Sequence, residues 1–368
     1  MHAGAWLDLA RVEELVAQRY IHKARHPTLP LYLYDYTRKA MFDGFWTPET
    51  IACRGLILDE DGCVIARPLD KFFNLEEHES TRLTALPDGP LEVTDKLDGS
   101  LIVLWWDGDQ PTCSTRGSFT SEQARWATAF LRARYDLSRL DRDLTLCFEA
   151  IYPANRVVLD YGQREDLVLL AARRRSDGYD LPYDELAALA DRFGLPLVPR
   201  LQVESLAALL DLAEQVSGVE GWVVRFPNGV RVKIKVPEYR RLHKLISGLN
   251  AARVRDALLG QGLDELILAL PEEFWPDVRA IALAITARVD AEAVRLRAAH
   301  ADLLAAGGAE SRKAYALLAR ERYPRDMPYL FPLLDGKAIE PALLKNVDLS
   351  GLDELATTIS RTQARLEG

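Results

Sequence analysis

The hydrophobic pattern of the chain changes once, near residue 245, and this change constrains the fold more than any other feature. Before it, short apolar runs with strand-like alternation are separated by turn signals such as Asp61-Gly62 and Asn228-Gly229. After it, apolar residues recur only at helical spacing. The helical stretches are 249–270, 272–306 and 309–322. We therefore predict an α+β domain over residues 1–245 and an all-helical domain over residues 246–368.

Composition and charge narrow the class of protein. The chain has 368 residues, of which 48% are hydrophobic and 27% charged, as in globular proteins with a sizeable core. Its net charge of -9 gives no support to nucleic-acid binding through bulk charge, although a local basic patch can still serve that purpose. Its four cysteines form no CxxC pair, which argues against a zinc ribbon or a disulfide framework and fits a reducing cytosol.

The sequence also bears on location. No apolar stretch approaches the length of a membrane span. The first residues lack the basic and apolar regions of a signal peptide. We therefore expect no membrane association and a cytoplasmic location.

The stretch from Glu92 to Trp106 carries the first chemical signal. Its apolar run, Leu101 to Trp106, follows Asp98-Gly99, a dipeptide typical of tight turns, so we predict a strand, a hairpin turn and a second strand. Lys96 stands at the head of this turn. A glycine nearby removes a side chain that would block the approach of a phosphate to the lysine amine. The alternative is an ordinary hairpin with a solvated lysine, and a lone Lys-x-Asp-Gly match is weak.

Charged residues recur at other strands and turns of the first 245 residues. Glu149 interrupts a buried-looking strand, where an isolated carboxylate is costly unless it binds something. Lys233 and Lys235 lie two apart on a strand and so share one face, which suits a polyphosphate but is also typical of a solvated surface. The full set, in chain order, is Arg54-Gly55, Lys71-Phe-Phe-Asn74, Lys96-Leu-Asp98-Gly99, Arg116-Gly117, Glu149, Glu220-Gly221 and Lys233-Ile-Lys235.

This ordered set resembles the covalent nucleotidyltransferase superfamily of DNA ligases, RNA ligases and mRNA capping enzymes. Within it, residues 30 to 245 are most similar to the bacteriophage-type RNA ligase 1 family. The resemblance implies a nucleotidyltransferase fold, with ATP-grasp-like antiparallel sheets and flanking helices, followed by an all-helical C-terminal domain that matches only in kind. One departure is Arg116, where the family pattern has lysine; the charge is kept but the hydrogen-bond geometry is not.

The resemblance also implies a three-step reaction. Lys96 attacks the α-phosphate of ATP to form lysyl-AMP, the AMP passes to an RNA 5′-phosphate, and a 3′-hydroxyl then displaces AMP. The implied cofactors are ATP and Mg²⁺ (or Mn²⁺), and the implied partner is RNA with 5′-phosphate and 3′-hydroxyl ends. A nicked tRNA, and hence RNA repair, is a guess at the level of the family. No obligate protein partner is inferred.

Site roles follow from the same resemblance. The predicted catalytic residues are Lys96, Glu220, Lys233 and Lys235. Those predicted to bind the nucleotide are Arg54, Lys71, Asp98, Gly99, Arg116, Glu149, Lys233 and Lys235. Glu149 and Glu220 are the predicted metal ligands. Nearby cations are expected to lower the pKa of Lys96 and so make its amine nucleophilic.

Other functions stay open at this point. A DNA ligase or a capping enzyme normally carries an OB-fold domain after the last motif, whereas this chain predicts only helices there. A catalytically idle RNA-binding protein on the same fold is a second alternative, although every charged position of the set is filled. A third is an unrelated α+β protein whose matches are coincidental.

Overall fold

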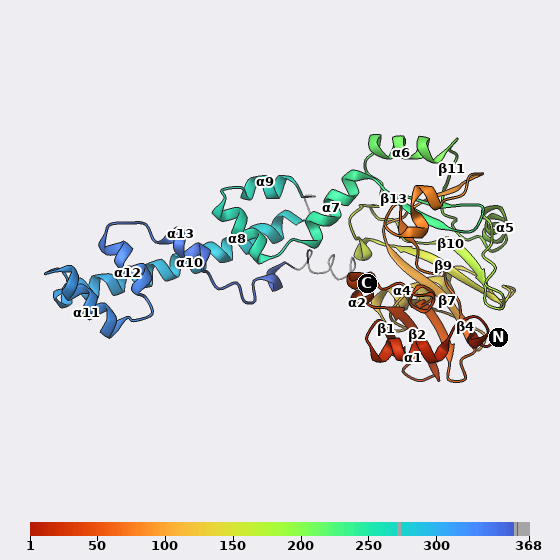
Figure 1. The fold of residues 1–368 in the computed structure, drawn as a ribbon, viewed down its shortest axis with the longest axis horizontal. Helices are drawn as coiled ribbons and strands as arrows, with labels where there is room; N and C mark the ends of the chain where they lie inside the picture. Colours follow the sequence, from red (N-terminus) through yellow and green to blue (C-terminus); the bar gives the residue numbers. More distant parts are fainter. Residues whose placement is uncertain (271–273, 357–358, 360–368) are drawn as a thin grey trace. The chain divides into compact units, whose positions relative to one another are not determined.

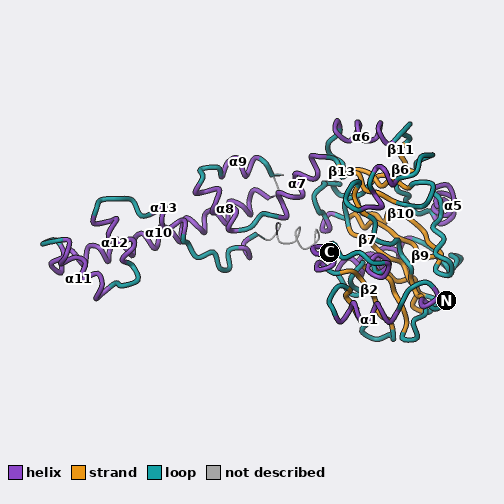
Figure 2. The backbone as a smooth tube through the Cα atoms, viewed as in Figure 1, coloured by secondary structure: helices purple, strands orange, loops and turns teal. Residues whose placement is uncertain are grey.

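The chain divides into two compact units between Arg241 and Leu242 in a computed structural model that describes residues 1–270, 274–356 and 359. Unit 1 contains every strand of the described residues, and unit 2 is built from helices (Figures 1 and 2). The predicted α+β class, with largely antiparallel sheets followed by a helical part, is confirmed. Among the described residues, no helix is both long and apolar enough to cross a membrane.

The first layer of unit 1 is a four-stranded antiparallel sheet in the order β1-β2-β3-β4. Its strands are β1 (Ile21–Arg25), β2 (Leu31–Tyr36), β3 (Arg54–Asp59) and β4 (Val64–Ala66). The helices α1 (Leu9–Ala17), α2 (Arg38–Asp43) and α3 (Pro48–Ala52) belong to the same region. Leu15 of α1 is fully buried in a cluster with Ile21 and Leu56, which anchors the helix to the sheet.

Two further sheets carry the charged motifs. One has the order β10-β9-β7-β8, with strands β7 (Ser100–Asp107), β8 (Gln110–Thr115), β9 (Leu144–Ile151) and β10 (Asp166–Arg174). The other has the order β11-β6-β12-β13-β5, with strands β5 (Phe73–Asn74), β6 (Glu92–Asp95), β11 (Arg200–Leu201), β12 (Gly221–Arg225) and β13 (Arg231–Lys235). Only the β13–β5 pair among the described strands is parallel. Helices α4 (Glu122–Arg134), α5 (Tyr183–Phe193) and α6 (Leu206–Gln215) complete the unit, with 3-10 turns at Ala3–Ala5, Glu79–Thr81, Leu83–Ala85 and Pro153–Asn155.

The predicted hairpin around Lys96 is wrong. Strand β6 pairs with β11 and β12 in one sheet, whereas β7 pairs with β8 and β9 in the other. A two-residue hairpin of the Asp-Gly type needs positive φ at both turn residues, and neither Asp98 nor Gly99 has it. The segment from Lys96 to Gly99 therefore crosses from one sheet to the other instead of reversing within one.

The predicted hairpin at Asn228-Gly229 is confirmed. Strands β12 and β13 pair antiparallel around it, and Gly229 has φ +84°, a conformation in which a side chain is strained. On β13, Val232 and Ile234 are buried. The alternation of a strand then places Lys233 and Lys235 together on the opposite face.

Unit 2 is built around one long helix, α10 (Trp275–Leu303). Helix α7 (Pro237–Ser247) spans the division between the units, and unit 2 continues with α8 (Ala251–Leu259), α9 (Leu263–Leu268), α11 (Arg312–Arg322), α12 (Met327–Leu334), α13 (Glu340–Lys345) and a 3-10 turn at Asp353–Leu355. The predicted helix over 249–270 is split in two, because Gly260 ends α8 and Gln261 takes positive φ. Of the predicted 272–306 helix, residues 272 and 273 lie outside the described residues. Its last residues belong to a π-helical turn, Leu304–Gly308, in which Gly307 takes φ +102°.

Candidate active site

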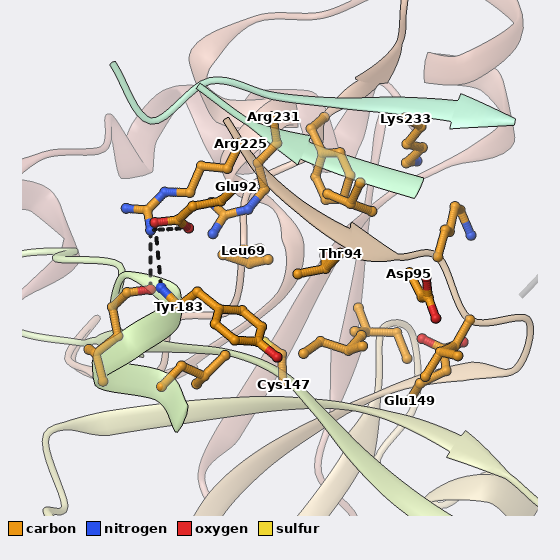
Figure 3. Close-up of a pocket in the computed structure, with 18 of the residues that line it drawn as sticks. Leu69, Glu92, Thr94, Asp95, Cys147, Glu149, Tyr183, Arg225, Arg231 and Lys233 are labelled. Carbon is orange, nitrogen blue, oxygen red and sulfur yellow. Dashed lines mark hydrogen bonds and ion pairs between the residues drawn. The ribbon is translucent and has the colours of Figure 1, made fainter. Parts of the chain in front are cut away.

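A cavity of about 230 Å³ lies between the two motif-bearing sheets (Figure 3). Strands β6, β12 and β13 supply one wall, and strands β7, β9 and β10 supply the other. The residues that line it and also belong to the predicted site are Arg54, Lys96, Gly99, Glu149 and Lys233. Helix α5 closes the far end with Tyr183, beside the Arg225 and Glu92 side chains. The cavity therefore brings together residues that are up to about half the chain apart in sequence.

Glu220 sits between two lysines. Its Oε1 atom lies 2.7 Å from Lys96 Nζ and 2.9 Å from Lys235 Nζ. The strand pairing creates this arrangement, because Lys235 lies opposite Gly221 and the Lys96 backbone N–H donates to the Gly221 carbonyl at 2.9 Å. Glu220 is only 2% exposed, so both ion pairs form largely out of water.

The charge balance around Lys96 differs from the prediction. Burial by itself lowers the pKa of the Lys96 ammonium, but the Glu220 and Glu149 carboxylates outweigh burial and leave the pKa raised. The expectation that neighbouring cations lower this pKa is therefore wrong for the protein alone. Conversely, burial raises the pKa of Glu220, but the two lysines outweigh burial and leave this pKa lowered.

Gly99 and Glu149 hold the crossing segment against β9. The Gly99 N–H donates to Glu149 Oε1 at 2.9 Å. A Cβ at Gly99 would stand 2.4 Å from the Ala150 carbonyl oxygen, so this position excludes any side chain. The glycine is thus required for the close approach of two backbones, while its predicted second role, room for a phosphate at the cavity, stays a prediction. Burial, together with the nearby Glu220 charge, raises the pKa of Glu149 to about 8.

Asp98 turns away from the cavity and fixes the crossing segment from behind. Its carboxylate accepts hydrogen bonds from the backbone N–H groups of Val158 and Leu159, at 2.8 and 2.7 Å, and from the Tyr239 hydroxyl at 2.7 Å. The Asp98 N–H in turn donates to the Tyr161 hydroxyl at 2.9 Å. The structure therefore gives Asp98 a positioning role beside Lys96, and its predicted contact with a nucleotide stays a prediction.

A second anchor lies at the start of β7. The Ser100 hydroxyl donates to the Asn155 side-chain oxygen at 3.0 Å, and the Asn155 amide nitrogen donates to the Ala150 carbonyl at 2.8 Å. Asn155 is 2% exposed. Together with the Asp98 contacts, this anchor ties the C-terminal side of the crossing segment to residues 155–161. The Lys96 end is held separately, by the hydrogen bond from its N–H to the Gly221 carbonyl.

The opposite side of the site is rich in cations. Lys233 and Arg54 line the cavity and lie over the Phe72 ring, at 4.8 and 5.3 Å from its centroid. Burial, reinforced by neighbouring cations, holds the pKa of Lys233 well below its usual range. Lys71 lines an adjoining cavity that shares Leu69 and Phe72 with the first, and burial lowers its pKa to about 8. These three cations form a region suited to a polyanion.

Arg116 is engaged by its own chain. Its Nε atom lies 3.0 Å from Asp35 Oδ2, and one of its terminal nitrogens donates to the Tyr36 hydroxyl at 2.6 Å. Burial raises the pKa of Asp35 to about 7, although Arg116 opposes the shift. Arg116 does not line the main cavity. The structure therefore places this predicted nucleotide ligand at the edge of the site, next to Lys71 and Arg54.

Sequence reasoning missed several cavity residues. Thr94 and Asp95 line the wall just before Lys96, and burial raises the pKa of Asp95. Their position immediately before the lysine is a signal that could have identified them. Tyr183 and Arg225 carry no such signal, because only the packing of α5 and β12 around the cavity brings them there.

The predicted metal ligands, Glu149 and Glu220, suit a metal ion that is held partly by the substrate, and not one held by protein ligands alone. Within the described ranges, no three His, Cys, Asp or Glu side chains cluster as a cage for a metal ion. Glu149 and Glu220 nevertheless both act on Lys96. Two carboxylates beside a cation-rich phosphate region suit Mg²⁺, which is commonly bound through one or two carboxylates plus substrate phosphates.

Similar proteins were found by sequence and by structure. A candidate RNA ligase of Thermovibrio ammonificans is 28% identical over 243 residues, which cover 63% of this chain and 62% of that protein. RNA ligase 1 of Bacteriophage TS2126 is 27% identical over an alignment of 393 residues, which covers 90% of this chain and 93% of that protein. A solved structure of an archaeal ATP-dependent RNA ligase matches with a TM-score of 0.48 and 19% identity, over 66% of this chain and 65% of that chain. The chain thus spans less than two thirds of the length of the first of these relatives.

A family model adds to these likenesses. The model of a family described as RNA ligase matches residues 52–239, just over half of the chain. The matched region contains all the residues that we predicted for the site, from Arg54 to Lys235. The chain therefore belongs to this phage-type RNA ligase family.

Proposed function

We propose that the protein is an ATP-dependent RNA ligase that joins 5′-phosphate and 3′-hydroxyl ends through lysyl-AMP and RNA-adenylate intermediates. The observation that carries this proposal is the position of Lys96. Its amine lies at a cavity between two sheets, is held by Glu220 and faces a cluster of cations. One lysine with an oriented amine next to an anion site is the arrangement that nucleotidyl transfer to lysine requires.

In the first step, the neutral amine of Lys96 attacks the α-phosphorus of ATP. A nitrogen–phosphorus bond forms, the bond from the α-phosphorus to the oxygen that bridges it to the β-phosphorus breaks, and pyrophosphate leaves. The attacking nitrogen gives up one proton to the Glu220 carboxylate, which lies beside it. The hydrogen bond to Glu220 directs the amine at 2.7 Å before attack. Arg54, Lys71 and Lys233 supply positive charge for the phosphates, and Lys235 does so beside Lys96.

Two transfers follow in the proposed reaction. An oxygen of the RNA 5′-phosphate displaces Lys96 from the adenylate, so that the lysine is regenerated as AMP moves to the RNA. The 3′-hydroxyl of the second end then attacks the 5′-phosphorus, and AMP leaves. A divalent cation, Mg²⁺ or Mn²⁺ near Glu149 and Glu220, would supply positive charge that stabilises the phosphate oxygens and favours the neutral amine.

The two parts of the chain have different proposed tasks. We assign nucleotide chemistry to residues 1–245 and selection of the RNA substrate to residues 246–368, with RNA repair, for example of a nicked tRNA, as the physiological setting. A DNA ligase or capping enzyme is disfavoured, because the described residues after Lys235 contain no strand and so no OB-fold. We propose a cytoplasmic location and no obligate protein partner.

The mass of the intact protein tests the proposal. Wild type and Lys96→Ala would each be incubated with Mg²⁺ or Mn²⁺ and with ATP, GTP or NAD. We expect an AMP-sized increase with ATP in the wild type alone, followed by joining of 5′-phosphorylated RNA. A GMP adduct would indicate capping chemistry. Absence of any adduct, after pyrophosphate treatment to remove AMP already attached, would leave an RNA-binding protein that lacks ligase activity.

A further inference from the structure

Phe42 is exposed to an unusual degree. Its side chain is 93% exposed, the highest value among the large hydrophobic residues of the described chain, and the adjacent Met41 is 53% exposed. Single exposed apolar residues are common, but two consecutive ones on a capped helix form a small apolar surface. We call Met41 and Phe42 the α2 platform (α2 in Figure 1).

The α2 platform is held rigidly. Thr37 caps the start of α2 by accepting from the Ala40 N–H, Ala40 is fully buried, and Gly44 ends the helix at φ +61°. Phe45, just beyond, stacks on Tyr20 at 4.2 Å between ring centroids. Both ends of the helix are thus fixed. The Met41 and Phe42 side chains nevertheless stay exposed to water, which is unfavourable in free energy and is not explained by folding alone.

The same segment leads directly into the cation region of the site. Trp46 packs edge-on against Tyr36 and Phe73, at 5.2 Å from each. Lys71 Nζ lies 5.0 Å from the Trp46 ring centroid, and the Arg116 guanidinium lies 4.6 Å from that of Tyr36. Since Phe42 and Trp46 are four residues apart, their backbones are separated by at most about 14 Å. The platform is therefore within reach of a strand whose phosphate lies at these cations.

We propose that the α2 platform stacks an unpaired base near the RNA end to be joined. The inference rests on the proposed function and adds a contact outside the nucleotide cavity. A flat aromatic ring accepts any base, and Arg38 at the start of the same helix adds positive charge for the phosphates that accompany it. Lys39 is already paired with Asp43 and lies over the Tyr20 ring. A single-stranded end can offer its bases in this way, and a base inside a duplex cannot. We therefore expect the platform to favour unpaired RNA.

Binding of fluorescently labelled, 5′-phosphorylated single-stranded RNA tests the proposal in wild type, Phe42→Ala, Phe42→Leu and Phe42→Trp. We expect the Ala and Leu variants to weaken Kd about 5- to 100-fold, because each lacks a flat ring, and the Trp variant to bind as wild type does. Leu is the matched control, since it keeps the apolar surface without the ring. Affinity for a blunt RNA duplex should not change.

Two controls separate the outcomes. Lysyl-AMP formation and the thermal midpoint should be the same in all four proteins, because the side chain is exposed and does not line the cavity. The proposal would be overturned if Phe42→Leu bound single-stranded RNA as tightly as the wild type does. It would also be overturned if the variants lost equal affinity for duplex and for single-stranded RNA. So would a wild-type dimer that Phe42→Ala dissolves in sedimentation, since the surface would then bind a second copy. If the wild type joins no RNA, the proposed function fails, while the binding series still decides the platform.

Discussion

Lys96 and Lys233 line the same cavity and are both largely buried, yet their pKa values move in opposite directions. Lys96 has Glu220 at 2.7 Å and Glu149 nearby, so its pKa is raised although burial opposes the shift. Lys233 has Arg54 and Lys71 as neighbours, so its pKa is lowered by burial and by like charge together. Burial lowers the pKa of both lysines, so the neighbouring charges account for the difference in sign between the two shifts.

This difference divides the site into two regions with separate needs. The carboxylate region around Lys96 already has its charges paired, and there the geometry of one amine is controlled. The cation region around Lys233 and Lys71 has unbalanced positive charge, which a polyphosphate would neutralise. A nucleotide bound across both would relieve the cation region and place its α-phosphate at Lys96. Four predictions test this comparison, in order of decreasing effect.

The largest effect is expected at the nucleophile. Lys96→Ala should abolish lysyl-AMP formation, since no other group takes over bond formation to phosphorus. Lys233→Ala should slow the same step but leave a measurable rate, because Arg54 and Lys71 remain. The readout is the AMP-sized mass increase over time with ATP. Equal residual rates in Lys96→Ala and Lys233→Ala would show that the carboxylate region and the cation region do not differ in their role in this step.

Glu220→Gln should follow. The substitution removes the charge that aligns Lys96 and Lys235, and a misplaced amine costs about 100-fold in rate. We expect the adenylylation rate to fall by about that factor, with little change in KM for ATP. Glu220→Asp, which keeps the charge on a shorter side chain, is the matched variant. A large rise in KM with an unchanged rate would instead assign Glu220 to nucleotide binding.

A pH effect is expected in the cation region. The pKa of Lys71 is about 8, so the ammonium is charged below that pH and loses its charge as pH rises through it. The second-order rate constant of adenylylation, kcat/KM for ATP, rises with pH as Lys96 loses its proton, and this rise should level off above about pH 8 in the wild type. In Lys71→Arg the rise should continue beyond pH 8, because the guanidinium stays charged. Identical pH profiles for the two proteins would exclude Lys71 as the titrating group.

The smallest effect is expected at Tyr161, which contacts the crossing segment through the Asp98 N–H. Tyr161→Phe removes the hydroxyl that accepts the Asp98 N–H and leaves a largely buried donor unpaired, at a cost of about 1–3 kcal/mol in the free energy of unfolding. Adenylylation should drop less than tenfold, since the Asp98 carboxylate keeps its other partners. Thermal unfolding and the adenylylation rate are the measurements. A loss as large as that of Glu220→Gln would make residues 155–161 part of the chemistry.

Local signals made much of the fold predictable. Asn228-Gly229 joins two strands with positive φ at Gly229, and Ser121, a residue type typical of helix starts, caps α4 by accepting from the Ala124 N–H. The face shared by Lys233 and Lys235 follows from the two-residue period of a strand. Each of these features depends on residues close in sequence, and at these positions the tertiary contacts agree with the local preference.

The path of the chain at Asp98-Gly99 was decided by long-range strand pairing and could not be predicted from local signals. Asp98-Gly99 has the composition of a hairpin turn, but β6 finds its partner in β12 and β7 finds its partner in β9. The turn residues are then held by Glu149, Val158 and Leu159, all at least 50 positions away. A dipeptide preference of small energy is outweighed by the pairing of two whole sheets.

The sequence by itself determined the residue types of the site, the order of the motifs, and the change from mixed structure to helices near residue 245. The tertiary structure alone decided that one carboxylate, Glu220, would join Lys96 to Lys235, and that Lys96 and Lys233 would have opposite pKa shifts. The physical reason is that the sign of a pKa shift depends on which charges lie within a few ångströms. Those neighbours come from strands that meet only after the sheets have formed.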